Sequence, residues 1–346
     1  MIFLVLAVVA LAGSGIWWLK RQKEGKFADR RSPPQIELVK LAPAERPLMG
    51  TLARIVVFAP DEESGRKAIE AAFERGEEIE AICTDYDPAS ELMKLSAAPP
   101  NQPVPVSSTL AAVLAYAHAT AELTEGAFDP TFGPLTRLWR ESRKEKALPD
   151  AEVLAKARRA SSWKNFEVDL EKRFVVLKHE GMQLDLGGIA KGFAADEMLG
   201  VLNDHGIHHA FIAIAGDVRL GAPPPGKSAW RVGIKTLGPK LTQFIEVSNC
   251  AVSTSGDLYQ FVQIDGVRYS HIIDPATGLG LTRRTAATVV APTAVQTDPL
   301  ATFCCIDPER ALKFFLAGEI SCRIVVLAEG QPLERATPQF PRVDAL

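Results

Sequence analysis

Strand-like segments in this chain follow one another through short turns more often than through helices. The segment Thr51–Ala59 (TLARIVVFA) is apolar and rich in β-branched residues, as strands are. Asp265 and Gly266 separate two further strand-like segments, at 259–262 and 269–273, and Asp-Gly in that place is typical of a β-hairpin turn. Because regular strand–helix–strand alternation is missing, the pattern predicts an α+β fold with mixed or antiparallel sheets and packed helices.

Apolar spacing and capping residues locate the other elements. Helices are expected at 61–84, 107–123, 191–205, 296–306 and 307–317, with a short helix beginning at Ser90. Strands are expected at 168–176, 183–186, 208–215, 230–235, 244–247, 251–256, 286–290 and 321–328. The charged stretch 137–160 is also predicted to be helical, with Trp139 turned inward.

The first 19 residues are almost wholly apolar. They are long enough to span a bilayer as an anchor. They also resemble a signal peptide, with Ala10 and Ala12 in an A-x-A-like pattern. Basic residues follow at 20–31, and next to an uncleaved anchor they favour a cytoplasmic location for the rest. We therefore expect a membrane anchor or signal segment at 1–19, a basic, Pro-bearing linker at 20–46, one folded domain at 47–330 and a polar tail at 331–346.

Composition excludes some classes of protein. The formal net charge of -3 does not suit a general nucleic-acid binder. The odd number of cysteines, 5, argues against a complete disulfide framework, although it leaves room for one disulfide. Buried structural thiols are the favoured interpretation.

The stretch Leu184–Asp196 (LDLGGIAKGFAAD) predicts an anion site. Gly187 and Gly188 let the backbone approach a ligand closely, and a helix that opens after them adds unpaired N–H groups and a positive dipole end. Lys191 adds a full positive charge, which suits phosphate. The alternative is an ordinary strand-to-helix turn with a solvated lysine. The spacing fits neither a Rossmann turn nor a P-loop.

Two further stretches carry candidate chemistry. In QTDPLAT, Asp298 and Thr302 lie four residues apart and share one face of a helix, where their oxygens suit Mg²⁺. Taken alone, Asp298 before Pro299 favours a helix N-cap over a metal ligand. In HIIDPATG, His271 is either a general base or a packed core histidine, and Asp274 most simply stabilises a turn.

Together these motifs resemble the FAD:protein FMN transferase (ApbE) family. The matching motifs, in order, are MGT at Met49, TDYDPASELMKLS at Thr84, GAFDPTFGPL at Gly126, LDLGGIAKGFAAD at Leu184, AGDVRLG at Ala215, SGD at Ser255, HIIDPATG at His271 and TDPLAT at Thr297. The resemblance runs from about Met49 to Leu327. Ala215 and Pro299 depart from the family pattern, which usually has glycine at the first position and a small non-proline residue at the second.

The resemblance implies a T-fold-related flavin transferase domain. Such enzymes bind FAD and Mg²⁺, attach FMN through a phosphoester bond to a threonine hydroxyl of an acceptor flavoprotein, and release AMP. Two alternatives stay open: an FAD pyrophosphatase that yields FMN and AMP, and a carrier that binds FAD without turnover.

The resemblance also implies roles for individual residues. Those expected to contact FAD are Met49, Tyr86, Ala127, Phe128, Asp129, Asp185, Lys191 and Ile272. Those expected to hold Mg²⁺ are Gly188, through its backbone carbonyl, Asp298 and Thr302. We expect His271 to take the proton of the attacking hydroxyl, with Asp274 as the second candidate. On its own, Asp129 in an Asp-Pro turn is as easily explained by hydrogen bonds to backbone donors.

The acceptor motif of the family is missing from this chain, since its nearest stretch, DGVRYS at Asp265, lacks the threonine. The enzyme is therefore expected to modify a partner rather than itself. Family acceptors are flavin subunits of membrane electron-transport complexes, on the outer face of the cytoplasmic membrane. That favours a protein that is anchored to the bacterial inner membrane or exported, on the periplasmic side, against the indication of the basic flank.

Overall fold

A single large antiparallel sheet organises the molecule, for which a computed structural model describes residues 37–345 except Pro239 and Ala317. Its strands are, in spatial order, β1 (Val39–Lys40), β3 (Thr51–Ala59), β7 (His209–Ile214), β8 (Asp217–Leu220), β11 (Ala251–Gly256), β14 (Thr285–Ala291), β15 (Ser321–Ala328) and β16 (Gln331–Ala336), and β2 (Ala44–Leu48) also pairs with β3. All of these neighbours pair antiparallel.

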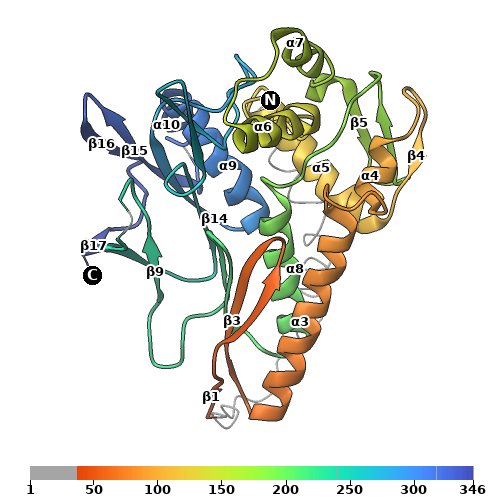
Figure 1. Ribbon diagram of the computed structural model, residues 1–346. Helices are drawn as coiled ribbons and strands as arrows, with labels where there is room; N and C mark the ends of the chain where they lie inside the picture. The colour runs from red at the N-terminus through yellow and green to blue at the C-terminus, as the bar shows by residue number, and fades with distance from the viewer. Residues whose placement is uncertain (1–36, 239, 317, 346) are drawn as a thin grey trace.

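Helices and small sheets surround the large sheet (Figure 1). The helices are α3 (Glu62–Cys83), α4 (Glu91–Ser96), α5 (Ser108–Leu123), α6 (Gly133–Glu145), α7 (Ala151–Arg159), α8 (Ala190–Asp204), α9 (Ala294–Ile306) and α10 (Pro308–Phe314), with a short 3₁₀ turn at Trp163–Asn165. The small sheets contain β4 (Val104–Pro105), β5 (Phe166–Asp169) and β6 (Phe174–Leu177); β9 (Trp230–Ile234), β10 (Gln243–Val247) and β17 (Asp344–Ala345); and β12 (Phe261–Ile264) and β13 (Val267–Ser270). This arrangement confirms the predicted fold class.

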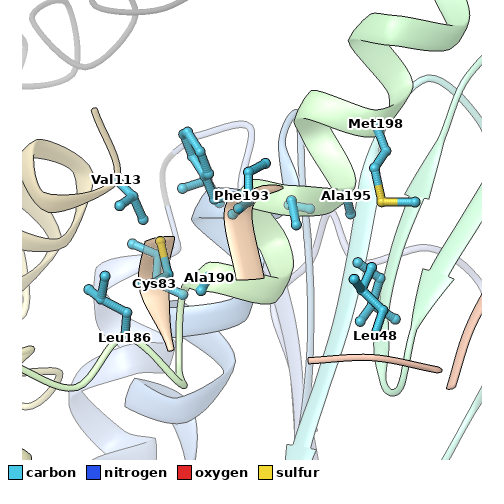
Figure 2. Close-up of a cluster of buried hydrophobic side chains, with 14 of the residues drawn as sticks. Leu48, Cys83, Val113, Leu186, Ala190, Phe193, Ala195 and Met198 are labelled. Carbon is cyan, nitrogen blue, oxygen red and sulfur yellow. The ribbon is translucent and has the colours of Figure 1, made fainter. Parts of the chain in front are cut away.

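The two faces of the large sheet are covered differently. Ile55 of β3 packs with the helices, whereas Val56 and Phe58 of the same strand pack against the cluster that contains Trp230 of β9, as the alternation of side chains along a strand requires. On the helical side, α3 lies beside α8 (Figure 1). Figure 2 shows part of the buried core along α8, with Leu48 of β2 beside Met198 of α8.

One tight turn and two helix starts agree with the residues that predicted them. Asp265 and Gly266 both have positive φ, 49° and 78°, and close the predicted hairpin. The caps expected for α4 and α5 are also present, since Ser90 and Ser107 accept hydrogen bonds from backbone N–H groups three residues later. At these positions the residues next to a turn or helix start were sufficient to predict it.

The interpretation of Asp298 as a helix cap is wrong. Helix α9 begins at Ala294, with Thr293 in the cap position, so Asp298 lies inside the helix and Pro299 follows it there. The carboxylate of Asp298 therefore does not cap α9. Residues 183–186 also differ from expectation, since they form no strand: the N–H of Leu184 donates to Ser96 Oγ and the N–H of Asp185 donates to the Pro130 carbonyl.

Strands occur closer to the chain ends than expected. β1 and the first three residues of β2 lie in the range expected to be a linker, and β16 and β17 lie in the range expected to be a tail. The apolar segment 1–19 lies outside the described residues. No helix in the described part of the chain has the length and apolar character needed to cross a membrane. All five cysteines are free thiols, and four of them are buried.

Candidate functional site

The predicted glycine pair forms the loop that leads into α8. The N–H of Gly187 donates to Oδ1 of Asp185 at 2.7 Å, which folds the loop back on itself. Lys191, in the first turn of α8, reaches back so that its Nζ donates to the Gly187 carbonyl at 3.0 Å. The lysine is thus fixed at the helix start, and the alternative of a solvated lysine does not hold.

Two buried carboxylates share the ammonium of Lys191. Its Nζ lies 3.0 Å from Oδ2 and 3.2 Å from Oδ1 of Asp298, and 3.2 Å from Oδ2 of Asp217 on β8. The N–H of Gly192 donates to Asp298 Oδ2 at 3.3 Å. When both carboxylates are ionised, the one ammonium between them leaves one negative charge in excess.

The pKa values reflect this excess of negative charge. Burial, and then the carboxylate of Asp217, raise the pKa of Asp298 to about 7. Burial alone would lower the pKa of Lys191, but Asp217 and Asp298 more than offset it and raise that pKa. A phosphate group brought to Lys191 would meet net repulsion from the carboxylates unless a cation accompanied it.

The neighbouring oxygens fit a hard divalent cation. Thr302 follows Asp298 by one turn of α9, and its Oγ1 lies 3.4 Å from Oγ of Ser255 on β11. Gly188 belongs to the loop that Lys191 contacts. The described residues contain no group of three or more His, Cys, Asp or Glu side chains placed to hold a metal. A cation here would use carboxylate, hydroxyl and carbonyl oxygens, as Mg²⁺ does, and take its remaining ligands from substrate or water.

His271 is held as a neutral imidazole. Its Nδ1 lies 3.2 Å from the Gln260 carbonyl, which only accepts, so the ring hydrogen is on Nδ1 and Nε2 keeps a lone pair. Burial lowers the pKa of His271 to about 4, and the positive charges of Arg143 and Lys191 act in the same direction. The ring is therefore available as a proton acceptor near neutral pH.

Asp274 stabilises a turn. Its Oδ1 accepts the N–H of Ala276 at 2.9 Å, and its own carbonyl accepts the N–H groups of Thr277 and Gly278. Asp129 is similarly engaged: Oδ1 accepts from the N–H and hydroxyl of Thr131, and Oδ2 accepts the N–H of Trp163 at 2.9 Å. Both carboxylates therefore organise the backbone around the site.

Phe128 and the apolar residues of the expected set lie against the glycine loop, in a buried cluster or in a turn. The ring of Phe128 lies so close to Gly188 that a Cβ added there would be 3.3 Å from it. Ala127 and Ile272 belong to one buried cluster. Met49 occupies the left-handed region with φ of 52° and, with Gly50, forms the turn between β2 and β3.

Tyr86 is exposed and lies under a guanidinium. Arg140 on α6 stacks over its ring, with the Arg140 Cζ 4.5 Å from the ring centre. Arg140 also pairs with Asp85, and its guanidinium lies 3.6 Å from Oδ2 of Asp185. Arg140 therefore connects two of the residues expected to contact FAD.

Comparison with known proteins places the chain in a family. The family model for ApbE matches residues 49–324, which is most of the chain. The chain belongs to the ApbE family. Among curated ApbE relatives, the FAD:protein FMN transferase of Treponema pallidum is 32% identical over 320 residues, with 86% of this chain and 82% of that protein covered. The FAD:protein FMN transferase of Vibrio cholerae is 31% identical, with 85% and 90% covered.

Solved ApbE structures share the fold. The ApbE protein of Thermotoga maritima superposes with a TM-score of 0.76 at 31% identity and covers 86% of this chain and 97% of its own. The flavin transferase ApbE of Vibrio cholerae gives a TM-score of 0.77 at 29% identity, with 88% and 98% covered. At the ApbE motif that begins with Ala215, this alanine takes the left-handed conformation, with φ of 53°, that the usual glycine adopts more easily.

The structure adds residues to this ApbE site that the sequence did not single out. Asp217 and Arg140 contact residues of the expected set, and Asp196 accepts the first backbone N–H groups of α9, the helix that carries Asp298 and Thr302. Asp217 follows a buried strand and the Ala215-Gly216 turn, and a carboxylate at that position is a signal that could have been used. Asp196 ends the motif Leu184–Asp196, but its partners, like those of Arg140, are distant in the chain, so the sequence did not indicate what either residue contacts.

Proposed function

We propose that this protein transfers FMN from FAD to a threonine hydroxyl of an acceptor flavoprotein, releases AMP, and requires Mg²⁺. The observation that carries the proposal is the cluster of Lys191, Asp217 and Asp298 at the start of α8, beside the glycine loop. Family membership supports it, since the curated relatives are named FAD:protein FMN transferase.

The cluster suits a diphosphate that arrives with a cation. Its excess negative charge would repel a diphosphate alone, and a divalent ion would reverse that sign. Asp298, Thr302 and the Gly188 carbonyl would hold Mg²⁺, which when bound supplies charge neutralisation at the phosphate oxygens. Lys191 and the positive end of the α8 dipole orient the diphosphate.

The residues around the site would support a nucleophilic displacement at phosphorus. The threonine oxygen of the acceptor attacks the FMN-side phosphorus, and the bond from that phosphorus to the bridging oxygen breaks, so that AMP leaves with this oxygen. Nε2 of His271, neutral near pH 7, takes the threonine proton. Asp274 is the second candidate for that proton. Tyr86 and Phe128 offer ring faces to the flavin.

The proposal extends to the cellular setting. We propose that residues 1–19 anchor the protein in the bacterial inner membrane or direct its export, and that it acts on the periplasmic side. The apolar composition of these residues supports the proposal. The acceptor would be a flavin subunit of a membrane electron-transport complex.

The test mixes the purified protein with FAD, Mg²⁺ and an acceptor domain that carries the threonine motif. In-gel flavin fluorescence on the acceptor, with AMP in equal amount, supports transfer. Removal of Mg²⁺ by EDTA, and the variants Asp298→Asn and Thr302→Val, should each abolish labelling. Free FMN and AMP without labelling would instead indicate an FAD pyrophosphatase, and absence of both products would indicate a carrier.

A further inference from the structure

Helix α9, which carries Asp298 and Thr302, is not capped by its own residues. Thr293 occupies the cap position but makes no capping hydrogen bond, and its hydroxyl donates instead to Oε1 of Gln296. The cap comes from α8. Oδ1 of Asp196 accepts the N–H of Ala294 at 3.0 Å, and Oδ2 accepts the N–H of Val295 at 2.8 Å. These are two of the N–H groups that a helix start leaves unpaired.

Asp196 is itself fixed by the large sheet. Nε of Arg219, on β8, donates to Oδ1 of Asp196 at 2.6 Å. The same guanidinium donates to the carbonyls of Leu220, at 2.9 Å, and Cys250, at 3.1 Å. The carboxylate of Asp196 therefore connects the start of α9 to α8 and to β8, the strand that begins with Asp217.

A second contact between α8 and α9 lies one turn earlier on α8. Gly192 and Asp196 are four residues apart and share a helix face. A Cβ on Gly192 would lie 2.1 Å from the Ala294 carbonyl oxygen, so the two backbones touch at a distance that only glycine permits. The N–H of Gly192 also donates to Asp298 Oδ2. α8 thus holds both the first residue of α9 and the carboxylate one turn further on.

We propose that Asp196 is a positioning residue for the cation site. By holding the first turn of α9 against α8, it sets the place of Asp298 beside Lys191 and of Thr302 one turn below. This inference rests on the proposed function, because it assumes that Asp298 and Thr302 bind Mg²⁺. A cap supplied by Thr293 would stabilise α9 equally well but would not fix where the helix lies relative to Lys191.

The test compares Asp196→Asn with a matched cap variant, Asp307→Asn. Asp307 caps the neighbouring helix α10 through the N–H of Arg310 at 3.1 Å and lies outside the site. Binding of Mn²⁺ as a probe for the Mg²⁺ site is measured by electron paramagnetic resonance in the presence of FAD, and melting temperatures are recorded alongside. We expect at least tenfold weaker Mn²⁺ binding for Asp196→Asn and unchanged binding for Asp307→Asn. Equal Mn²⁺ affinity in the two variants would overturn the inference.

A third variant separates positioning from simple capping. Thr293→Asp, added to Asp196→Asn, gives α9 a local cap. We expect it to recover the melting temperature without recovering Mn²⁺ affinity, whereas recovery of both would mean that Asp196 is only a cap.

If Asp196→Asn does not fold, Arg219→Gln takes its place: it keeps the carboxylate and frees it from β8, and unchanged Mn²⁺ binding would then contradict the inference. Failure of the wild-type protein to bind Mn²⁺ with FAD would overturn the proposed function as well.

Discussion

The ammonium of Lys191 lies 3.2 Å from Oδ2 of Asp217, so the first turn of α8 is bound to the first residue of β8. The same ammonium contacts Asp298. Replacement by Lys191→Met would leave both carboxylates without a counter-charge, and breaking a buried pair in this way costs about 3 to 5 kcal/mol of unfolding free energy. We therefore expect a marked fall in melting temperature for this variant.

Added Mg²⁺ should restore part of that stability, because a bound cation offsets the two carboxylates. We expect the melting temperature of Lys191→Met to rise more with Mg²⁺ than that of the wild-type protein. The matched control is the double variant Lys191→Met with Asp298→Asn, which has one carboxylate fewer and should respond less. An equal Mg²⁺ response in all three proteins would contradict the prediction.

Gly192 and Gly188 should tolerate alanine very differently. At Gly192 the new methyl group would meet the Ala294 backbone at 2.1 Å, so α8 and α9 must move apart. Overpacking of this kind costs about 3 kcal/mol or more. At Gly188 the methyl group would lie 3.3 Å from the Phe128 ring, which can shift slightly, and we expect a loss of about 1 kcal/mol. Urea unfolding of the two variants measures the difference, and similar losses would show that the helices are not in close contact.

Arg140 should control FAD affinity more than turnover. In Arg140→Met the carboxylates of Asp85 and Asp185 lose the guanidinium between them, and the ring of Tyr86 loses its stacking partner. We expect the KM for FAD to rise about tenfold, or about 1.4 kcal/mol, with kcat nearly unchanged. Arg140→Lys is the control, because it keeps the positive charge without the planar guanidinium. Its KM for FAD should lie between those of the wild-type protein and Arg140→Met. A fall in kcat at unchanged KM would argue against this role.

His271 should make the wild-type protein sensitive to mild acid. Its pKa is lowered to about 4 in the folded state, against about 6.5 when unfolded, so between these values the unfolded chain binds more protons. Its contribution to stability is therefore present above pH 6.5 and is lost as the pH falls toward 4. Relative to His271→Gln, the wild-type protein should lose roughly 1 to 3 kcal/mol of unfolding free energy between pH 7 and pH 4.5. Parallel pH curves for the two proteins would exclude the shift.

Local signals in the sequence predicted local structure well. Ser90, Ser107 and the Asp265-Gly266 pair act on residues next to them, so their caps and turn appear as expected. Asp298 and Pro299 carry an equally clear local signal for a helix start, yet the helix begins at Ala294. The cap that decides this start belongs to Asp196, almost a hundred residues away, and no local pattern could reveal it.

The same distinction explains the candidate site. Lys191 and Asp298 were each found through motifs, and the structure brings them together. Their shared partner Asp217 was not singled out, although it lies in the motif AGDVRLG. The stacking residue Arg140 was missed because it acts through contacts between distant segments. The short strands β1 and β2 were missed for a related reason: a Pro-bearing edge strand is defined by the strand it pairs with more than by its own composition.

The ion pair between Lys191 and Asp298 joins residues 107 positions apart. During synthesis on the ribosome, a chain that has emerged only through α8 and β8 has the glycine loop and the lysine but neither Asp298 nor Thr302. The emerging polypeptide therefore completes the proposed cation site only after most of its length has been made, and a product terminated before Asp298 would lack that site.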